Sequence, residues 1–407
     1  MSEQCSFTLE GLLSAEAVRA RCGEIGNAAE AGRTRWFEYH PENLESCIDL
    51  VAKECMRNYP DLDIPFHSRW RHFVVGGVDL WRHYRQAKLQ GLGKESLARS
   101  AIDLVFLSVI LDAGAGARWR YVDPVTHEVL TRSEGLAAAT IELFFNHLGR
   151  QAEDQGIVID ARAIMSANRQ VLHKAFQHRV DNELLGIDGR FQLLSQFAKQ
   201  LTTLAPSGFS RPGHLIDLLL RRSASRRVSA GQVLKLVLQC FNPMWPSGVV
   251  IDGTPLGDCG RHTEFKSNDA SGLVPFHKLS QWLTYSLIEP LQWAGFEVTD
   301  LDQLTGLPEY RNGGLVLDTK VLVPKQSDLY STPLEVQEEP VVEWRALTVW
   351  LLDKIAAGVR TKLDLGAEQL PLASVLQGGT WSAGRRLAEE LRGGAPPLQL
   401  AIDGTVF

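Results

Sequence analysis

The spacing of apolar residues constrains the fold of this chain more than any other feature of its sequence. Apolar side chains recur every three or four positions through most of the 407 residues, a pattern typical of amphipathic helices. Ser14 is placed to cap a first helix, which ends near Gly32. The same pattern predicts further helices over residues 94–112, 133–149, 189–201, 213–222, 230–241, 275–296, 340–360 and 380–393.

Strand signals are few and short. Residues 118–132 are typical of a hairpin, and residues 314–325 and 398–407 could each add a strand. The predicted fold class is therefore mainly α, a multi-helix globular fold with a few short β-hairpins. A Pro-, Gly- and Ser-rich stretch near residue 205 predicts an N-terminal helical lobe with a small hairpin, 1–205, and a C-terminal helical lobe, 206–407. The two lobes are expected to pack as one unit.

Composition and charge narrow the function classes. The 42 Lys and Arg against 48 Asp and Glu give a net charge of −6, which provides no global attraction to nucleic acid or to an anionic membrane. The six cysteines form no CxxC pair, the N-terminus lacks the basic flank of a signal peptide, and the apolar run at 104–111 is too short to span a membrane. We therefore expect a reduced, cytoplasmic protein. Nucleotide-binding and zincin motifs are absent, so no cofactor is expected. The oligomeric state stays open.

Asp112 is the first candidate for catalysis. It follows a strongly apolar helix, where the negative end of the helix dipole and burial both disfavour a charged carboxylate. Such a group suits a general acid or a hydrogen-bonding anchor. The alternative is a structural turn in which Asp112 accepts bonds from the amides of the following "AGAG" segment.

Glu309 has the opposite setting. Gly306 and Pro308 predict a helix start that places Glu309 in the first turn, where backbone N–H groups keep a carboxylate ionised. An ionised carboxylate there can activate water or stabilise positive charge on a sugar. The alternative is a glutamate that only stabilises the helix. Next to it, the glycines at 313–314 could let the backbone approach a ligand closely.

Other candidates have strong structural alternatives. Asp318 is predicted on a strand, and Glu343 and Arg345 are predicted in the first turn of a long helix, where a capping acid and a solvated arginine are equally expected. Aromatic residues such as Trp119 and Trp282 could stack on a flat ligand, but aromatics at helical spacing more often belong to the core.

Several sequence blocks together resemble one known family. "HSRWRHF", "LLDAGAG", "VPFHKLSQWLTYSLIEP", "LTGLPEYRNGG", "EWRALTV", "GGTWSAGR" and the terminal "DGTVF" are similar to blocks of the uracil-catabolism family of the URC pathway, long catalogued as a domain of unknown function. The resemblance covers essentially the whole chain. It implies an N-ribosyl hydrolase that cleaves ribosylurea, or its 5′-phosphate, to urea and the ribose product.

A fainter resemblance points to similar chemistry. The queuosine-salvage nucleosidases, helical proteins shaped like DNA glycosylases, carry Asp-Tyr-Arg where this chain has Glu309-Tyr310-Arg311. This similarity implies a DNA-glycosylase-like helical architecture and a carboxylate that acts on a glycosidic bond. The residues after the motif differ, so no substrate contact carries over.

The two resemblances give the candidate residues roles. Glu309 is expected to activate water or stabilise an oxocarbenium-like transition state, and Asp112 to hydrogen-bond or protonate the departing urea, with Asp318 and Asp403 as rivals. The candidates for contacts with the small-molecule substrate are Arg69, Arg71, His72, Trp119, His277, Lys278, Arg311, Asn312, Glu343 and Arg345.

Two other functions remain open from the sequence. The first is a metal-assisted amidohydrolase that uses His67, His72 or His277, although the 67/72 spacing does not place both rings on one helical face. The second is a non-catalytic partner of the uracil ring-opening enzyme.

Overall fold

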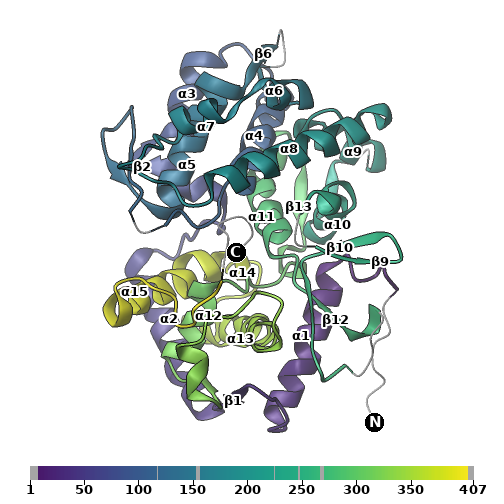
Figure 1. The fold of residues 1–407 in the computed structure, drawn as a ribbon. Coiled ribbons are helices and arrows are strands. Elements are labelled where there is room, and N and C mark those ends of the chain that lie inside the picture. Colours follow the sequence, from purple (N-terminus) through teal and green to yellow (C-terminus); the bar gives the residue numbers. More distant parts are fainter. Residues whose placement is uncertain are drawn as a thin grey trace.

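Helices dominate the structure, as the apolar spacing predicted, and the mainly α fold class is confirmed (Figure 1). The structure is a computed structural model that describes residues 8–116, 118–152, 156–223, 225–245, 248–265 and 270–401. Its α-helices are α1 (Ala15–Glu30), α2 (Leu44–Asn58), α3 (Leu80–Lys88), α4 (Lys94–Ile110), α5 (Arg132–Glu142), α6 (Ala161–Ser166), α7 (Arg169–Ala175), α8 (Ile187–Leu204), α9 (Leu215–Arg222), α10 (Ala230–Phe241), α11 (Lys278–Trp293), α12 (Tyr310–Asp318), α13 (Glu339–Leu363), α14 (Leu372–Val375) and α15 (Trp381–Arg392). Two shorter helical segments that matter for the site are η2 (Arg69–Phe73) and η10 (Leu376–Thr380).

The described strands are two to four residues long and pair only two at a time. The predicted hairpin at 118–132 is confirmed as β4–β5. The antiparallel pairs are β1 (Phe37–Tyr39) with β14 (Leu322–Pro324), β2 (Val74–Val75) with β3 (Val78–Asp79), β4 (Tyr121–Val122) with β5 (Val129–Leu130), β6 (Arg150–Ala152) with β7 (Gly156–Val158), β9 (Val249–Ile251) with β10 (Thr254–Gly257), and β11 (Cys259–Arg261) with β12 (Leu273–Pro275). The parallel pair is β8 (Arg227–Ser229) with β13 (Glu297–Thr299).

Helices far apart in the sequence pack side by side. α1 and α2 both pack against α13, and α11 packs against α4. In Figure 1, α3 to α9 form the upper part of the molecule, whereas α1, α2, α12, α13 and α15 form the lower part. Buried apolar side chains from Ala15 to Leu398 make one continuous core cluster. No helix within the described ranges combines the length and apolar character that a membrane crossing requires.

Several predicted elements differ from the structure. The segment predicted as a strand from residue 314 continues α12 as far as Asp318, and only Leu322–Pro324 is a strand. α13 begins at Glu339, one residue earlier than predicted, so Glu343 lies in its second turn and not in its first. At the C-terminal end, Leu400 forms a single bridge with Leu334 instead of a longer strand, and residues 402–407 lie outside the described ranges.

Glycines allow α12 to lie close to its neighbours. A Cβ atom on Gly384 of α15 would lie 2.1 Å from the carbonyl oxygen of Arg311, and one on Gly313 would lie 2.6 Å from the ring of Trp344 in α13. The indole Nε1 of Trp344 donates to the carbonyl oxygen of Gly313 at 3.0 Å. Gly313 therefore serves helix packing, and not the close approach of a ligand that its position suggested.

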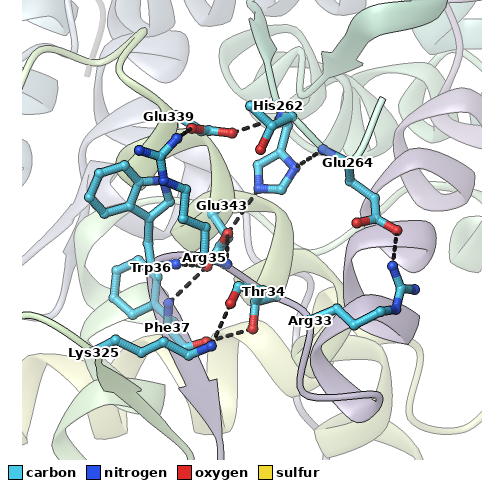
Figure 2. Close-up of polar contacts among 11 residues, drawn as sticks. Arg33, Thr34, Arg35, Trp36, Phe37, His262, Glu264, Lys325, Glu339 and Glu343 are labelled. Atoms are coloured by element: carbon cyan, nitrogen blue, oxygen red, sulfur yellow. Dashed lines mark hydrogen bonds and ion pairs between the residues drawn. The ribbon is translucent and has the colours of Figure 1, made fainter. Parts of the chain in front are cut away.

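A buried glutamate joins α13 to the segment before β1, as Figure 2 shows. The Oε1 atom of Glu343 accepts from the backbone N–H groups of Trp36 (2.9 Å) and Phe37 (2.8 Å). Its Oε2 atom accepts from the N–H of Arg35 (3.0 Å) and lies 2.9 Å from Nε2 of His262. Because Nδ1 of His262 accepts from a backbone N–H, Nε2 carries the proton and donates to the glutamate. Glu343 is fully buried, and its role is therefore structural.

Replacing Gly384 by alanine should destabilise the protein. The added methyl group must displace the backbone of α12 or α15, which costs about 2 kcal/mol or more. Chemical denaturation of Gly384→Ala would measure this loss. The matched control is Gly23→Ala in α1, where a Cβ meets no atom within 4 Å and the better helix propensity of alanine should stabilise by about 0.5–1 kcal/mol. Equal stability of the two variants would contradict this packing argument.

Glu343→Gln should lower the free energy of unfolding by about 3 kcal/mol. The neutral amide loses charge-assisted bonds and places a donor opposite buried N–H donors. The control is Glu368→Gln at an exposed position, for which a change within about 0.5 kcal/mol is expected. Thermal and denaturant unfolding of both variants would check the difference, and a wild-type stability for Glu343→Gln would refute it.

Candidate active site

A cavity of about 480 Å³ brings together residues from seven parts of the chain. Its walls come from the η2 region, the loop after α4, and the starts of α5, α11, α12 and α15, and the loop after α15 closes it. The predicted site residues that line it are His72, Asp112, Lys278, Glu309 and Arg311. The cavity is therefore the place where the two leading carboxylate candidates meet.

Glu309 is the residue that caps α12. Its Oε2 accepts from the N–H of Arg311 (2.8 Å), and its Oε1 accepts from the N–H of Asn312 (2.7 Å). The helix-start position predicted from the sequence is thus confirmed, with Glu309 as the cap and not a first-turn residue. Burial nevertheless raises the pKa of Glu309, against the opposing effects of Arg311 and the two N–H groups. The N–H groups at the helix start favour the ionised form, as the sequence predicted, while desolvation acts in the opposite direction and has the larger effect on the pKa.

Asp112 lies directly after α4, and a buried arginine holds it in place. Nη1 of Arg69 forms an ion pair with Oδ2 of Asp112 at 2.8 Å, while Nε of Arg69 donates to Oγ of Ser108 at 2.7 Å. Arg69 has no exposed surface. The other carboxylate oxygen, Oδ1, is buried and finds no hydrogen-bond partner in the described part of the chain. The ion pair favours a charged Asp112, and a charged carboxylate is a hydrogen-bond acceptor and not a proton donor.

The loop after α4 depends on a residue that the sequence did not single out. Nε of Arg190, in α8, donates to the carbonyl oxygen of Leu111 at 3.1 Å. Its Nη2 donates to the carbonyl oxygens of Ala113 (2.7 Å) and Gly114 (3.1 Å). These bonds satisfy carbonyl groups at the helix end, where the dipole is negative. They fix the cavity wall that carries Asp112.

Two neutral histidines line the cavity with opposite hydrogen-bonding character. Nδ1 of His72 lies 3.0 Å from Nη1 of Arg69, which can only donate, so the proton of His72 is on Nε2. Nδ1 of His67 lies 2.9 Å from Oε1 of Gln377, so His67 carries its proton on Nδ1 and has a lone pair on Nε2. Burial lowers the pKa of His67 to about 4 and holds that of His72 well below its usual value.

Two tryptophans flank these histidines. The ring of Trp282 lies 4.6 Å from that of His67 and 6.0 Å from that of His72. The ring of Trp381 lies 5.5 Å and 5.9 Å from the same two rings. Trp381 directly follows the π-helical turn η10, which also carries Gln377. Trp381 was missed as a site residue, although the block "GGTWSAGR" had been noted for the family resemblance.

Cationic side chains complete the polar lining. Burial lowers the pKa of the Lys278 ammonium, whereas the negative charge of Glu309 acts to raise it. Arg311 lies with its guanidinium 4.1 Å over the ring of Trp381, and its Nε donates to the hydroxyl of Tyr310 at 3.1 Å. Its Nη1 is buried and has no hydrogen-bond partner within the described ranges. Arg132 also lines the cavity and was not predicted.

Asp318, one of the two rival carboxylates, lies outside the cavity. Asp318 ends α12, not a strand, and both its oxygens bind the guanidinium of Arg392, at 2.7 and 2.8 Å. It does not line the cavity. Asp403 lies outside the described residues.

Four predicted substrate contacts instead make structural bonds. Arg71 pairs with Glu289 on α11. Arg345 binds both oxygens of Asp258, at 2.8 and 2.7 Å, and therefore is not a solvated arginine. Glu343 holds the segment before β1, as described above. Asn312 is buried and donates from Nδ2 to the carbonyl oxygen of Leu307 at 3.1 Å.

Two predicted ring contacts belong to the core. Trp119 is fully buried, and its Nε1 donates to the carbonyl oxygen of Phe176 at 2.9 Å. His277 is buried with its Nε2 2.8 Å from the carbonyl oxygen of Leu12. Neither residue lines the cavity. Among the described residues, no group of three or more His, Cys, Asp or Glu side chains is placed to hold a metal ion.

Comparison with known proteins gives the family. Residues 11–407 match the family described as "Protein of unknown function (DUF1688)". The chain is 34% identical over 409 residues to Protein urg3 of Schizosaccharomyces pombe, covering 98% of this chain and 99% of that protein. It is 33% identical over 432 residues to Uracil catabolism protein 4 of Lachancea kluyveri, covering 97% of this chain and 98% of that protein. The protein therefore belongs to the DUF1688 family, as its sequence motifs predicted.

Proposed function

We propose that this protein acts in uracil catabolism and hydrolyses the N-glycosidic bond of a ribosylurea, which releases urea. The name of the Lachancea kluyveri relative supports the pathway. The observation that carries the reaction is the cavity itself, where two carboxylates of different environment, Glu309 and Asp112, face two neutral histidines of opposite hydrogen-bonding character.

The histidine pair fits a neutral ureide group. A ureide presents a carbonyl oxygen that accepts hydrogen bonds beside N–H groups that donate them. Nε2–H of His72 can donate to the oxygen, and the lone pair on Nε2 of His67 can accept from an N–H. The rings of Trp282 and Trp381 suit the flat faces of the same group. Since both histidines stay neutral, this arrangement needs no charge on the ligand.

The side chains expected around C1 of the ribose provide the groups that hydrolysis requires. Glu309 takes a proton from the attacking water, and its raised pKa makes it a stronger base than an ordinary glutamate. The charged Asp112 stabilises the positive charge that develops on the sugar as the C1–N bond breaks. The electron pair of that bond goes to the urea nitrogen, while the N–H of His72 stabilises negative charge on the urea oxygen.

Proton balance requires a donor for the departing urea. Lys278 is suited to this step because its lowered pKa makes its ammonium a better acid, and Glu309 is among the charges that act on it. The proton that Glu309 takes from water then returns to Lys278. This assignment differs from the one expected from sequence, in which Asp112 protonated the urea, because the ion pair with Arg69 favours a charged Asp112.

Purified protein incubated with ribosylurea, and separately with its 5′-phosphate, should release urea. Glu309→Gln should lower kcat by at least about a hundredfold, because it removes the general base. Asp112→Asn should lower kcat by roughly tenfold or more, because it removes the charge beside the oxocarbenium. The control Glu183→Gln, an exposed glutamate paired with Arg118, should keep wild-type turnover. No urea from either substrate, or full activity in folded Glu309→Gln, would refute the proposed reaction.

The pH dependence of kcat should be bell-shaped and narrow. Activity rises with pH as Glu309 loses its proton, at a pH above the ordinary range for glutamate because burial raises its pKa. Activity falls again as Lys278 loses its proton, at a pH below the ordinary range for lysine because burial lowers its pKa. Glu309→Gln should remove the acid limb from whatever activity remains, and Lys278→Arg should move the basic limb upward. A flat profile in both variants and in the wild type would contradict these two roles.

A further inference from the structure

A second hollow of about 760 Å³ adjoins the cavity. Gly116, Arg132, Trp381 and Gly393 line both spaces, so the two share a wall. The charged residues that line the second hollow are mostly arginines: Arg57, Arg120, Arg132, Arg385 and Arg386, against Glu54 and Glu389. Five cations against two anions leave this hollow with a formal charge of +3, in a protein whose total charge is −6.

Ion pairs already occupy several of these arginines. Arg57 and Arg386 both bind Glu54, at 2.7 and 3.2 Å. Arg385 pairs with Glu134 at 2.6 Å. These arginines are therefore held by protein carboxylates, and the positive charge that a ligand could use lies elsewhere in the hollow.

Arg132 is different from its neighbours. It lines both spaces, and no hydrogen bond or ion pair joins it to another residue in the part of the chain that the structure describes. Its φ of 54° puts a non-glycine residue in the left-handed region at the first position of α5, a conformation that costs energy and is concentrated at functional sites. This local geometry presents a guanidinium that is unpaired among the described residues at the junction of the two spaces.

Arg311 provides a second unsatisfied guanidinium atom on the cavity side. Its side chain is buried, with 4% exposure, and lies flat on Trp381, which lines both spaces. The buried Nη1 has no hydrogen-bond partner within the described ranges. A buried donor without a partner is unfavourable, so a ligand that accepts a hydrogen bond from it is bound more tightly.

We propose that the substrate is a sugar phosphate, whose phosphate group binds at this junction to Arg132 and Arg311 while the ureide lies between the histidines. A phosphate dianion accepts bidentate hydrogen bonds from two guanidinium groups, which a neutral ribose hydroxyl cannot do. The identity of the sugar rests on the proposed function. The anion site itself rests only on the geometry of the two arginines.

Calorimetric titration with ribose 5-phosphate, ribose and inorganic phosphate tests the anion site without any reaction. Ribose 5-phosphate should bind at least about tenfold more tightly than ribose, and phosphate alone should compete with it. Arg132→Gln should weaken ribose 5-phosphate binding by roughly tenfold to a hundredfold, as expected for a lost charge-assisted contact, and Arg132→Lys should lose less. The matched control is Arg179→Gln, an exposed arginine outside both spaces, which should bind as wild type does.

The result also separates this proposal from the proposed reaction. Equal affinity for ribose and ribose 5-phosphate, or wild-type affinity in Arg132→Gln, would overturn the phosphate site even if ribosylurea is hydrolysed. Binding of ribose 5-phosphate that depends on Arg132, in a protein that releases no urea, would retain the phosphate site and overturn only the reaction. Should Arg132→Gln fold poorly, Arg132→Lys gives a second measurement: it should bind ribose 5-phosphate more weakly than wild type, and wild-type affinity in this variant would overturn the phosphate site.

Discussion

The buried guanidinium of Arg69 is the interaction on which the candidate site depends. A cation with no exposed surface has to be neutralised, and here Asp112 provides the opposite charge. Ser108 and His72 accept further hydrogen bonds from the guanidinium, whose Nη2 atom has no hydrogen-bond partner among the described residues. The backbone N–H of Arg69 also donates to Ser286 of α11, at 2.9 Å. One residue therefore fixes the end of α4, the η2 segment and α11 relative to one another. It also places a positive charge 2.8 Å from Asp112 and decides that the proton of His72 is on Nε2.

The two carboxylates of the cavity illustrate how burial and charge compete. Glu309 receives two backbone N–H groups at a helix start, an arrangement that favours ionisation, yet burial raises its pKa. Asp112 lies at the unfavourable end of a helix, yet a guanidinium 2.8 Å away compensates for that position. In both cases an effect that depends on the whole fold acts against the local helix dipole. For this reason the proposed mechanism keeps Glu309 as the base expected from the sequence and assigns the acid to Lys278 instead of Asp112.

Much of the fold could be predicted because it depends on near neighbours. Ser14 accepts a hydrogen bond from the N–H of Ala17, three residues later, and Gly393 ends α15 in the left-handed conformation. Both helix ends could therefore be predicted from neighbouring residues in the sequence. The helix α2 was missed, although its buried residues Cys47, Ile48 and Val51 have helical spacing and the signal was present. By contrast, the second half of α12 was predicted as a strand, because its sequence Gly-Gly-Leu-Val-Leu lacks the apolar spacing of a helix. Its helix is stabilised by the Glu309 cap and by packing on α13 and α15.

The sequence by itself determined the mainly α class, most helix positions, and the family to which the chain belongs. It also identified Glu309 and Asp112, since each stands at a helix end that only neighbouring residues define. The tertiary structure decided which charged residues reach the cavity. Asp318, Arg345 and Glu343 are bound outside the cavity by partners 74, 87 and more than 300 residues away in the sequence. Arg132, by contrast, lines the cavity and has no polar partner in the part of the chain that the structure describes. Helix formation is a matter of contacts three or four residues apart, but the pairing of charges depends on distances in space that no local pattern encodes.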